Sequence, residues 1–587
     1  MLNHPPPAEP PPESTYLSPI ELAALQNKRV HRSNKAYIVE QQHDKFPELC
    51  FNISVKRGIS TFGDVAVKSI NGELQQMLDK EVFEPIPKRA LSREEHNNII
   101  RCHMFLKEKF NADGSFQKLK ARLVAGGNTQ DRTVYESISS PTASLTAVLT
   151  VATIAAKEQR IVQVVDITGA YLNASMGKVK VFMRIDGQLA ELMGNLDPKF
   201  KGCTNNDGSI IVQLKKALYG CIESAKLWYE LLVKVLKEDF GMVENPYDKC
   251  VLNKSTSSGV QLTVVIYVDD LFITCTEQSV IKELLSFLKV KFTTIIEHSG
   301  PILSYLGMSF NYSVSGKVKV TMQGYINDLL DTLKVQGTVS TPATNNLFSV
   351  VDDEKANPPL SVKSGKEFHT VVAKLLYLAK RARPDILTAV TFLASRVQKS
   401  TVEDQLKLTR LLKYLNGTRD CGITLEQRYN YPVAYCDASY GIHPDCKSHT
   451  GLYITLGSGP IFVGSSKQKV IAKSTTEAEL IALSDSAGQI LWTREFICGQ
   501  LGSDSDRHPP AIIYEDNLTT IALLKTGKSQ TQRTKHIKIR YYFLKDRQDK
   551  GEVLVKHIST DNMIADIFTK PLQGSQFNYL RSKLLNS

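Results

Sequence analysis

Residues 262–274 read Leu-Thr-Val-Val-Ile-Tyr-Val-Asp-Asp-Leu-Phe-Ile-Thr, an apolar, β-prone run that two adjacent carboxylates interrupt. The run predicts two buried strands with Asp269 and Asp270 at the turn between them. Two neighbouring carboxylates are costly to bury unless a cation neutralises them. An ordinary polar turn is the alternative, but Asp-Asp lacks the glycine that tight hairpin turns favour. The pattern therefore favours a metal site over a plain turn.

A third carboxylate, Asp166, supports the metal site. It ends the apolar run Ile161–Asp166, which predicts a strand, and Gly169–Leu172 then predicts the start of a helix. A carboxylate at a strand end, beside a hairpin that carries two more, can hold two divalent ions about 3.5–4 Å apart. Mg²⁺ prefers such oxygens and keeps positions open for water and phosphate. The arrangement is the one a nucleotidyl transferase needs, with one ion activating a primer 3′-hydroxyl and the other stabilising the departing pyrophosphate.

A second series of carboxylates begins with Asp437, near the end of a predicted strand. Two more short strands are predicted over residues 451–456 and 461–464, and a long helix follows. That helix begins at Ser474-Thr475-Thr476-Glu477, which has the S-x-x-E form of a capping box. Because capping gives Glu477 a local structural role, Glu479 is the better candidate for chemistry.

Two later carboxylates complete this series. Asp516 follows a short predicted strand, and its neighbour Glu515 is expected to point the opposite way because side chains alternate along a strand. Asp566 lies in Ala565–Lys570, which is predicted to be the final helix. Four carboxylates in this order suit two Mg²⁺ ions that activate a water against a phosphodiester.

The composition limits the classes of protein to consider. Of 587 residues, 42% are hydrophobic and 22% are charged, which excludes a wholly disordered or fibrous chain. The formal net charge of +12 favours a polyanionic partner such as nucleic acid, with a generic basic surface as the alternative. The longest apolar run, Thr146–Ala156, is well short of the ~20 residues that span a bilayer. The N-terminus has no basic region followed by an apolar stretch, so secretion is not expected.

Changes in composition and hydrophobic pattern divide the chain into four predicted parts. Residues 1–65 form a Pro-rich tail and linker, and residues 66–325 alternate between helix-like and strand-like segments. Residues 326–430 form a mainly helical connector, in which Lys380, Arg381 and Arg383 either touch a nucleic-acid backbone or form a solvated helix face. Residues 431–587 carry the second carboxylate series.

The first carboxylate set resembles a known family. Tyr267-Val268-Asp269-Asp270 is similar to the Y-x-D-D signature of reverse transcriptases, and Asp166 followed by Tyr171 resembles their first metal aspartate and the aromatic residue under the sugar. By this resemblance, Tyr171 excludes a 2′-hydroxyl and so selects deoxynucleotides. A core aromatic at a helix start is the alternative for Tyr171.

The surrounding segments resemble the copia class of LTR retrotransposon polyproteins. Residues 118–130 are similar to that class's basic fingers segment, which makes Lys120 and Arg122 candidates for contact with the triphosphate. A solvated basic strand is the alternative for both residues. Matching segments also occur at residues 214–220, 227–229, 305–307, 375–379, 383–386 and 411–418.

One position departs from the copia pattern. The class commonly has Gln near the incoming nucleotide where this chain has Glu223. A carboxylate there repels a triphosphate unless it is protonated or paired with a cation such as Lys226.

The second series resembles ribonuclease H in its order of acids and its three-strand, then α/β, layout. Glu479 lies in Glu-Leu-Ile-Ala, similar to the Glu-Leu-x-Ala that carries the helix carboxylate in that family. By resemblance, His557 assists proton transfer or product release, a role that suits histidine near neutral pH; a lone surface histidine is the alternative. Residues 534–541 match the basic copia segment between the third and fourth acids.

The resemblance implies an α+β right-hand polymerase with fingers, palm and thumb, then a helical connector and an α/β ribonuclease H-like domain. It implies an RNA-directed DNA polymerase and hybrid ribonuclease that uses two Mg²⁺ ions per active site, or Mn²⁺ in their place. The expected partners are RNA template, DNA primer, RNA–DNA hybrid and dNTPs, with upstream polyprotein domains or a second copy of the chain and no membrane. The expected location is intracellular, in cytoplasmic virus-like particles or the nucleus. Two rivals stay open, a decayed or co-opted inactive copy that binds nucleic acid and a structural subunit of an active partner.

Overall fold

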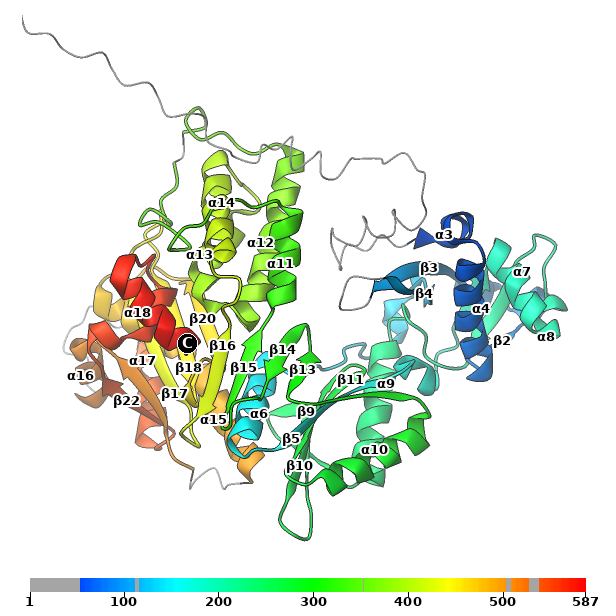
Figure 1. Cartoon of the computed structure of the whole chain (residues 1–587), viewed down its shortest axis with the longest axis horizontal. Coiled ribbons are helices and arrows are strands. Elements are labelled where there is room, and N and C mark those ends of the chain that lie inside the picture. Colours follow the sequence, from blue (N-terminus) through cyan, green and yellow to red (C-terminus); the bar gives the residue numbers. More distant parts are fainter. Residues whose placement is uncertain (1–52, 111–115, 352, 503–507, 527–537, 587) are drawn as a thin grey trace, which may run out of the picture.

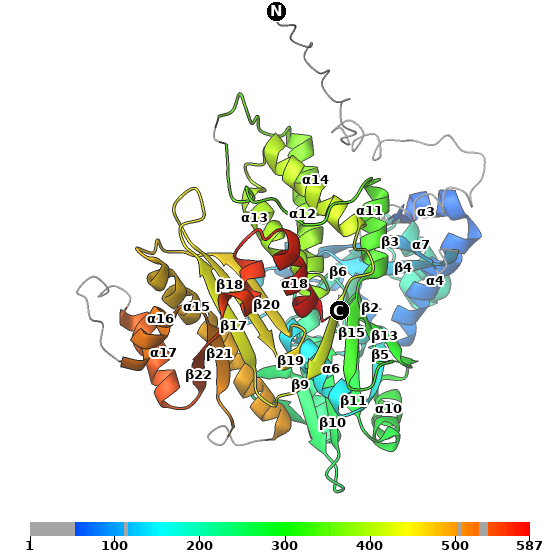
Figure 2. The same ribbon diagram turned by 60° about the vertical axis from the view of Figure 1, so that its left-hand side comes forward.

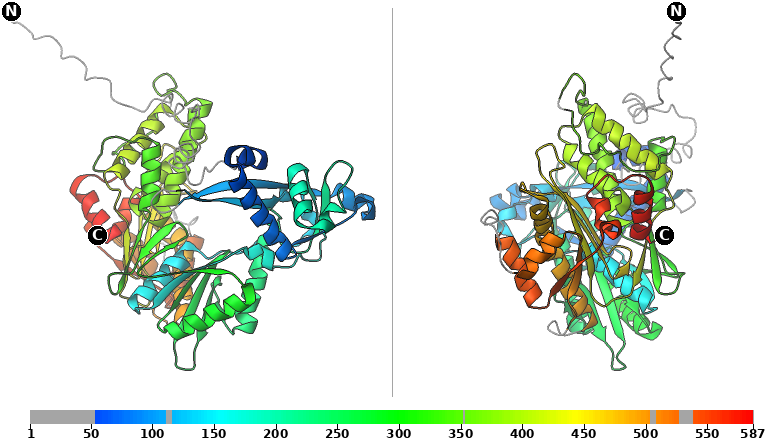
Figure 3. Two further views of the ribbon diagram at one scale, coloured as in Figure 1. Left: turned by 45° about the vertical axis from the view of Figure 1, so that its right-hand side comes forward. Right: turned by 90° about the vertical axis from the view of Figure 1, so that its left-hand side faces the viewer.

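The computed structural model describes residues 53–110, 116–351, 353–502, 508–526 and 538–586. Most of the expected tail and linker, residues 1–52, lies outside the described residues. Strands in the described part form four sheets, and Figure 1 shows them in succession from the N-terminal lobe on the right to the fourth sheet on the left. The N-terminal lobe and helices α11–α14 rise on opposite sides of the second sheet (Figure 3).

The N-terminal lobe has its own core around the first sheet. Its strands run β1-β3-β6-β7-β2, with β4 paired to β3. Alternation along β4 buries Leu119, Ala121 and Leu123, so Lys120 and Arg122 lie on the opposite face. The elements are β1 (Ile53–Ser54), α3 (Val55–Phe62), α4 (Asp64–Asp79), β2 (Phe83–Pro85), α5 (Arg93–Asn97), β3 (Ile100–Phe110), β4 (Phe116–Ala125), β6 (Phe182–Ile185), α7 (Gly187–Leu196), α8 (Pro198–Lys201) and β7 (Ile210–Leu214).

The second sheet is antiparallel and carries the first carboxylate set. Its order is β12-β5-β11-β10-β9-β8. Every residue of the apolar run 146–156 in helix α6 is buried, as expected for a helix without a polar face. The elements are α6 (Leu145–Lys157), β5 (Ile161–Ile167), α9 (Ser224–Lys234), β8 (Val243–Asn245), β9 (Asp248–Ser255), β10 (Gln261–Tyr267), β11 (Asp270–Cys275), α10 (Gln278–Phe292) and β12 (Ile295–Ser299).

The third sheet joins segments that are distant in the sequence. Its order is β13-β14-β15-β16-β19, and β15 pairs with β16 from Lys317↔Glu426 to Val320↔Ile423. The strands are β13 (Ile302–Tyr305), β14 (Met308–Asn311), β15 (Lys317–Thr321), β16 (Ile423–Gln427) and β19 (Gly457–Ser458). The sheet therefore contains strands from both sides of the expected domain boundaries at residues 325 and 430. The domain boundaries themselves stay a proposal.

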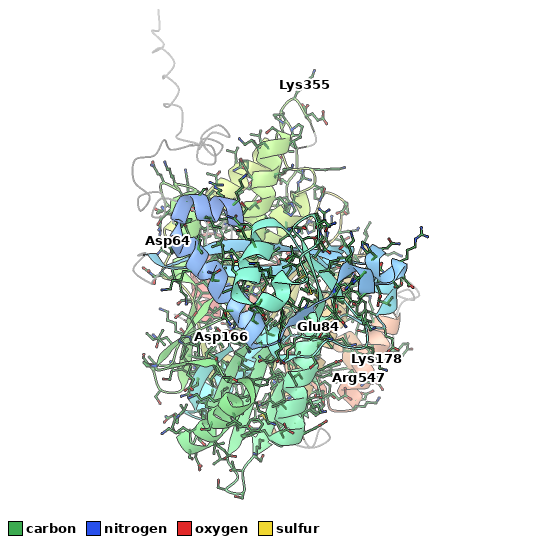
Figure 4. All side chains as sticks on the ribbon, turned by 90° about the vertical axis from the view of Figure 1, so that its right-hand side faces the viewer. Asp64, Glu84, Asp166, Lys178, Lys355 and Arg547 are labelled. Carbon is green, nitrogen blue, oxygen red and sulfur yellow. The ribbon has the colours of Figure 1, made fainter. Side chains whose placement is uncertain are left out.

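The connector helices are α11 (Gln323–Thr332), α12 (Val362–Arg381), α13 (Leu387–Arg396) and α14 (Val402–Asn416). The segment that carries Lys355 projects at their outer end (Figure 4).

The expectation that Arg383 touches a nucleic acid or solvent is wrong, because its side chain is fully buried and pairs with Asp385 at 2.7 Å. Arg383 also donates to the Thr418 carbonyl oxygen at 2.6 Å, so it holds the connector together. Lys380 donates to the Val463 carbonyl oxygen, and Arg381 lies over the Tyr377 ring.

The fourth sheet carries the second carboxylate series in the order β20-β18-β17-β21-β22. Strands β17, β18 and β20 are antiparallel, while β17, β21 and β22 are parallel. Helix α18 lies between this sheet and the connector helices (Figure 2). The elements are β17 (Val433–Ser439), β18 (His449–Thr455), β20 (Phe462–Lys467), α15 (Thr475–Leu501), β21 (Ala511–Glu515), α16 (Leu518–Thr526), α17 (Lys538–Asp549), β22 (Val553–His557) and α18 (Gly574–Leu585).

Two predicted helices are shorter or displaced. The segment after Asp166 makes only the 3₁₀ turn Ala170–Asn173, because Gly169 adopts a left-handed conformation (φ 63°). Asp566 lies in the 3₁₀ helix Ile564–Phe568, and the final helix is α18. None of the described helices combines the length and apolar character that a membrane crossing requires.

Two candidate carboxylate active sites

The first site lies at one end of the second sheet. Strands β10 and β11 pair from Thr263↔Thr274 to Tyr267↔Asp270, which leaves Val268 and Asp269 as the turn. The prediction that Asp270 also lies in the turn is wrong, because Asp270 is the first paired residue of β11. Asp270 also pairs directly with Asp166 on β5. The Ile167 N–H donates to the Asp269 carbonyl oxygen at 3.0 Å, so the turn is tied to the same strand. The register thus brings the three predicted aspartates to one sheet end, and Figure 4 labels Asp166 between the N-terminal lobe and the elements below it.

The turn has an unusual backbone. Val268 adopts φ 59°, a left-handed conformation that is a genuine outlier for a β-branched residue. The Trp228 indole N–H donates to the Val268 carbonyl oxygen at 2.7 Å. Trp228 is itself 1% exposed and packs edge-on against Phe292. The indole therefore holds in place the strained peptide that precedes Asp269.

Burial and mutual repulsion change the acidity of the pair. Burial, with the charges of Asp269 and Asp166, raises the pKa of Asp270 to about 6. Burial is also the main reason that the pKa of Asp269 is raised. Both shifts disfavour the ionised carboxylates, mainly through burial, so a bound cation would stabilise the ionised forms.

An aromatic and basic surface lies beside these aspartates. The rings of Tyr171 and Tyr219 lie 4.6 Å apart, and the guanidinium of Arg122 lies 4.8 Å from the centre of the Tyr219 ring. The charge of Asp269 contributes to raising the pKa of both tyrosines, after burial. The structure therefore brings Tyr171 and Arg122 together near Asp269. Lys120 lies two residues from Arg122 on the same face of β4.

Glu223 has partners that the sequence did not predict. Its Oε1 accepts from the Tyr135 hydroxyl at 2.8 Å and its Oε2 accepts from Gln130 Nε2 at 3.1 Å. Lys226, named as a cation that could neutralise this carboxylate, instead donates from Nζ to the Ser137 carbonyl oxygen and lies 3.8 Å from Glu230. The carboxylate is 5% exposed, and neutral donors rather than a cation satisfy it.

A cavity of about 760 Å³ opens beside the first site. Its lining includes Asp166, Asp270, His298 and the hairpin turn Tyr305–Gly307. Leu306 has φ 53°, and its carbonyl oxygen accepts from the hydroxyl of Tyr377 on α12 at 3.1 Å. A connector residue thus fixes the turn that faces the two aspartates.

The second site gathers three of the four predicted acids. One ligand oxygen from each of Asp437, Glu479 and Asp516 lies within 4.8 Å of the other two, and among the described residues no other group of acid, histidine or cysteine ligands is this compact. Asp437 and Glu479 are 2% and 5% exposed. Glu479 Oε2 is buried and has no hydrogen-bond partner in the described part of the chain. An all-carboxylate set with an unsatisfied buried oxygen fits Mg²⁺.

The fourth acid, Asp566, contacts a lysine instead. Its Oδ1 lies 2.6 Å from Lys570 Nζ, which is also 3.5 Å from Asp437 Oδ2. The Thr569 hydroxyl donates to the same Asp437 oxygen. Lys570 was missed, although its spacing of four residues from Asp566 was a usable signal.

The neighbouring acids differ in their roles. Ser474 accepts from the Glu477 N–H, but the Glu477 carboxylate accepts from the Lys473 N–H, so the reciprocal bond of a capping box is absent at this helix start. Glu515 lies outside the group of three and is fully buried, and burial raises its pKa to about 9. The charge of Glu515, after burial, also raises the pKa of Glu479. Burial and the charge of Asp437 raise the pKa of Asp566 to about 7.

His557 is exposed at the end of β22, in register with Glu515. Of the basic segment 534–541, residues 534–537 lie outside the described residues. The proposed role of that segment therefore stays a prediction.

The chain is similar to known retrotransposon proteins. Residues 91–345 match the family described as reverse transcriptase (RNA-dependent DNA polymerase). The chain is 28% identical over 498 residues to the retrovirus-related Pol polyprotein from transposon RE1 of Arabidopsis thaliana, covering 83% of this chain and 32% of that protein. It is 27% identical to the polyprotein from transposon TNT 1-94 of Nicotiana tabacum, covering 81% and 35%, and 26% identical to the transposon Ty1-LR2 Gag-Pol polyprotein of Saccharomyces cerevisiae, covering 80% and 26%.

The chain thus spans about a third of the length of the first of these relatives. Among solved structures, the prototype foamy virus protease-reverse transcriptase matches 87% of this chain and 55% of its own at 14% identity, with a TM-score of 0.25 that supports no argument. The resemblance drawn from the motifs is confirmed: the chain is similar to copia-class retrotransposon polyproteins, and its residues 91–345 match the reverse transcriptase (RNA-dependent DNA polymerase) family.

Proposed function

We propose that the chain is an RNA-directed DNA polymerase joined to a ribonuclease H, which copies RNA into DNA and degrades the RNA strand of the hybrid. The observation that carries the proposal is the direct pairing of Asp166 with Asp270 beside the Asp269 turn. The compact group Asp437, Glu479 and Asp516 supports the ribonuclease part. The proposed domains are residues 66–325, 326–430 and 431–587.

At the first site, Asp166, Asp269 and Asp270 would hold two Mg²⁺ ions. When bound, such ions activate a primer 3′-hydroxyl and stabilise the pyrophosphate that leaves. The chain's own side chains position the nucleotide. Lys120 and Arg122 attract the triphosphate through their positive charge. Tyr171, braced by Tyr219, lies under the sugar and excludes a 2′-hydroxyl.

The primer side is assigned to the hairpin that lines the cavity. Tyr377 holds the Leu306 carbonyl oxygen, so the turn presents a fixed backbone to a primer terminus near Asp270. Phosphate contacts along such a surface depend on charge and shape and carry no sequence information. The binding of primer and template is therefore expected to tolerate any sequence.

At the second site, Asp437, Glu479, Asp516 and Asp566 would hold the ions that cleave RNA. Those ions, when bound, activate a water against the phosphodiester. Thr560 donates to Asp516 Oδ2 at 2.8 Å and fixes that carboxylate. We assign to His557, exposed at the strand end, assistance in proton transfer or in product release.

The proposed substrates are RNA template, DNA primer, RNA–DNA hybrid and dNTPs, with Mn²⁺ as a replacement for Mg²⁺. The proposed location is inside the cell, in cytoplasmic particles or the nucleus. Upstream polyprotein domains and a second copy of the chain are the proposed protein partners.

The test is extension of a DNA primer on an RNA template, with hybrid cleavage measured in parallel. We expect Asp269→Asn with Asp270→Asn to abolish extension and leave cleavage, and Asp437→Asn to do the reverse. A folded parent chain that binds hybrid tightly but performs neither reaction would establish the inactive copy. Glu223 is the departure from the copia pattern that favours such a copy, but the hydrogen bonds from Tyr135 and Gln130 give this carboxylate a structural role.

A further inference from the structure

One side of the second site is held by a lysine of the chain itself. Lys570 Nζ lies 2.6 Å from Asp566 Oδ1 and 3.5 Å from Asp437 Oδ2. The two carboxylate side chains are 4% and 2% exposed, while the lysine side chain is 35% exposed. The ammonium therefore reaches from a partly open position into a buried acidic pair.

Asp437 belongs to two neighbouring groups at once. With Glu479 and Asp516 it forms the compact set, in which Glu479 Oε2 is buried without a hydrogen-bond partner among the described residues. With Asp566 it forms the second group, and there Lys570 supplies the positive charge. One group is thus open to a cation, while the other already contains one.

We propose that Lys570 is a built-in cation that competes with the second divalent ion of this site. The first ion binds to Asp437, Glu479 and Asp516, and the second binds between Asp437 and Asp566 only when Lys570 withdraws. The inference rests on the proposed ribonuclease function.

The chemistry of lysine suits this exchange. Its ammonium is a compact charge on a flexible four-carbon stem, so it can neutralise two carboxylates and still leave. A divalent ion interacts more strongly with the same oxygens but must displace the ammonium to reach them. Occupancy of the second position therefore depends on the position of the lysine side chain.

Binding of Mn²⁺, followed by electron paramagnetic resonance of the free ion, tests the stoichiometry. The full chain would carry Asp269→Asn and Asp270→Asn, so that the first site does not contribute. We expect one tight ion in this background and a second, weaker ion. Lys570→Gln should tighten the second ion by about tenfold, the scale on which groups near a metal change its affinity. Lys550→Gln is the matched control, because Lys550 pairs with Asp546 on the surface of α17.

Two equally tight ions in the parent background, or a second ion that Lys570→Gln leaves unchanged, would overturn the inference. Adding Asp437→Asn tests the proposed function separately. If that variant binds both ions as before, the metal assignment fails, whatever Lys570 does.

Lysine reactivity gives a second readout that needs no substitution at residue 570. Acetic anhydride labelling, followed by mass spectrometry, reports how accessible each amine is. Labelling of Lys570 should rise as Mn²⁺ fills the second position, while labelling of Lys550 stays constant. Constant labelling of Lys570 across the titration would also contradict the exchange.

Discussion

Asp166 and Asp270 are direct partners in the register of two antiparallel strands, β5 and β11. Their pairing places two carboxylates at one sheet end, with Asp269 in the adjoining turn. Burial is the main cause that raises the pKa of Asp270 to about 6, with further contributions from both neighbours. A cation bound at this sheet end would stabilise the ionised carboxylates.

Replacing Asp270 should reveal the energetic cost of this repulsion. Its pKa in the folded protein lies above that of an unfolded aspartate, about 3.9, so the ionised carboxylate destabilises the fold as pH rises from about 4 to above 6. In EDTA at pH 8, Asp270→Asn should raise the free energy of unfolding by roughly 1–2 kcal/mol, allowing for solvent screening, and by little at pH 4. Urea denaturation at pH 4, 6 and 8 measures this. A variant no more stable than the parent at pH 8 would refute the argument.

The indole of Trp228 should matter for polymerisation alone. Trp228→Phe removes the hydrogen bond to the Val268 carbonyl oxygen, a loss of about 0.5–1.5 kcal/mol. If that energy holds the turn in its active form, primer extension should slow by roughly three- to tenfold while hybrid cleavage is unchanged. Trp492→Phe is the matched control, because Trp492 also packs on a phenylalanine and donates to a carbonyl oxygen, that of Tyr247, outside the turn. Equal loss of extension in both variants would assign the effect to general packing.

Glu223→Gln should be less conservative than it looks. If the oxygen of the new amide at position 223 continues to accept from Tyr135, the amide nitrogen faces Gln130 Nε2. Two N–H donors would then oppose each other. We expect a loss of about 1 kcal/mol in stability. Adding Gln130→Glu should recover part of it, because the exchanged pair again joins donor to acceptor and still accepts from the Ile222 N–H. Recovery is incomplete because the hydrogen bond from Gln130 Nε2 to the Tyr135 hydroxyl is lost. Thermal unfolding of both single variants and the double variant gives the coupling energy, and simple additivity would contradict this account.

Gly451 should be essential for RNA cleavage. A Cβ at this position would lie 2.7 Å from the Ala565 carbonyl oxygen and 2.7 Å from Thr569 Cγ2. Gly451→Ala must therefore push the Asp566 segment away from Asp437, and we expect at least a tenfold loss of hybrid cleavage with extension retained. Gly488→Ala, on α15 with open space around it, is the control and should be neutral or slightly stabilising. Full cleavage activity in Gly451→Ala would show that the segment moves freely.

Local patterns in the sequence predicted the parts of each site that lie on one element. The hairpin with Asp269 and Asp270 and the strand with Asp166 followed from periodicity. The preference for Glu479 over Glu477 agrees with the compact group, although the capping box used to argue for it lacks its reciprocal bond. The burial of Arg383 did not, because its partners Asp385 and Thr418 become a buried network only when two connector helices pack. From the sequence alone, a cationic side chain is expected to be exposed to solvent.

Contacts between distant segments account for the other features of the sites that the sequence did not predict. Tyr219 lies in a segment that the sequence singled out, but its contact with the Tyr171 ring depends on how the N-terminal lobe packs on the second sheet. The 3₁₀ turn around Asp566 and the hydrogen bonds of Tyr135 and Gln130 to Glu223 likewise depend on tertiary packing, for which residue order alone gives no signal. The sequence therefore predicted site composition better than site geometry.

The pairing of β15 with β16 has a consequence for synthesis on the ribosome. Roughly a hundred residues separate the two strands, so β15 emerges well before its partner exists. At a synthesis rate of about 5–20 residues per second, the backbone groups on this edge of β15 stay unpaired for several seconds. A nascent chain that stops before β16 would retain the first carboxylate set but expose an open edge, and such truncated products are expected to aggregate.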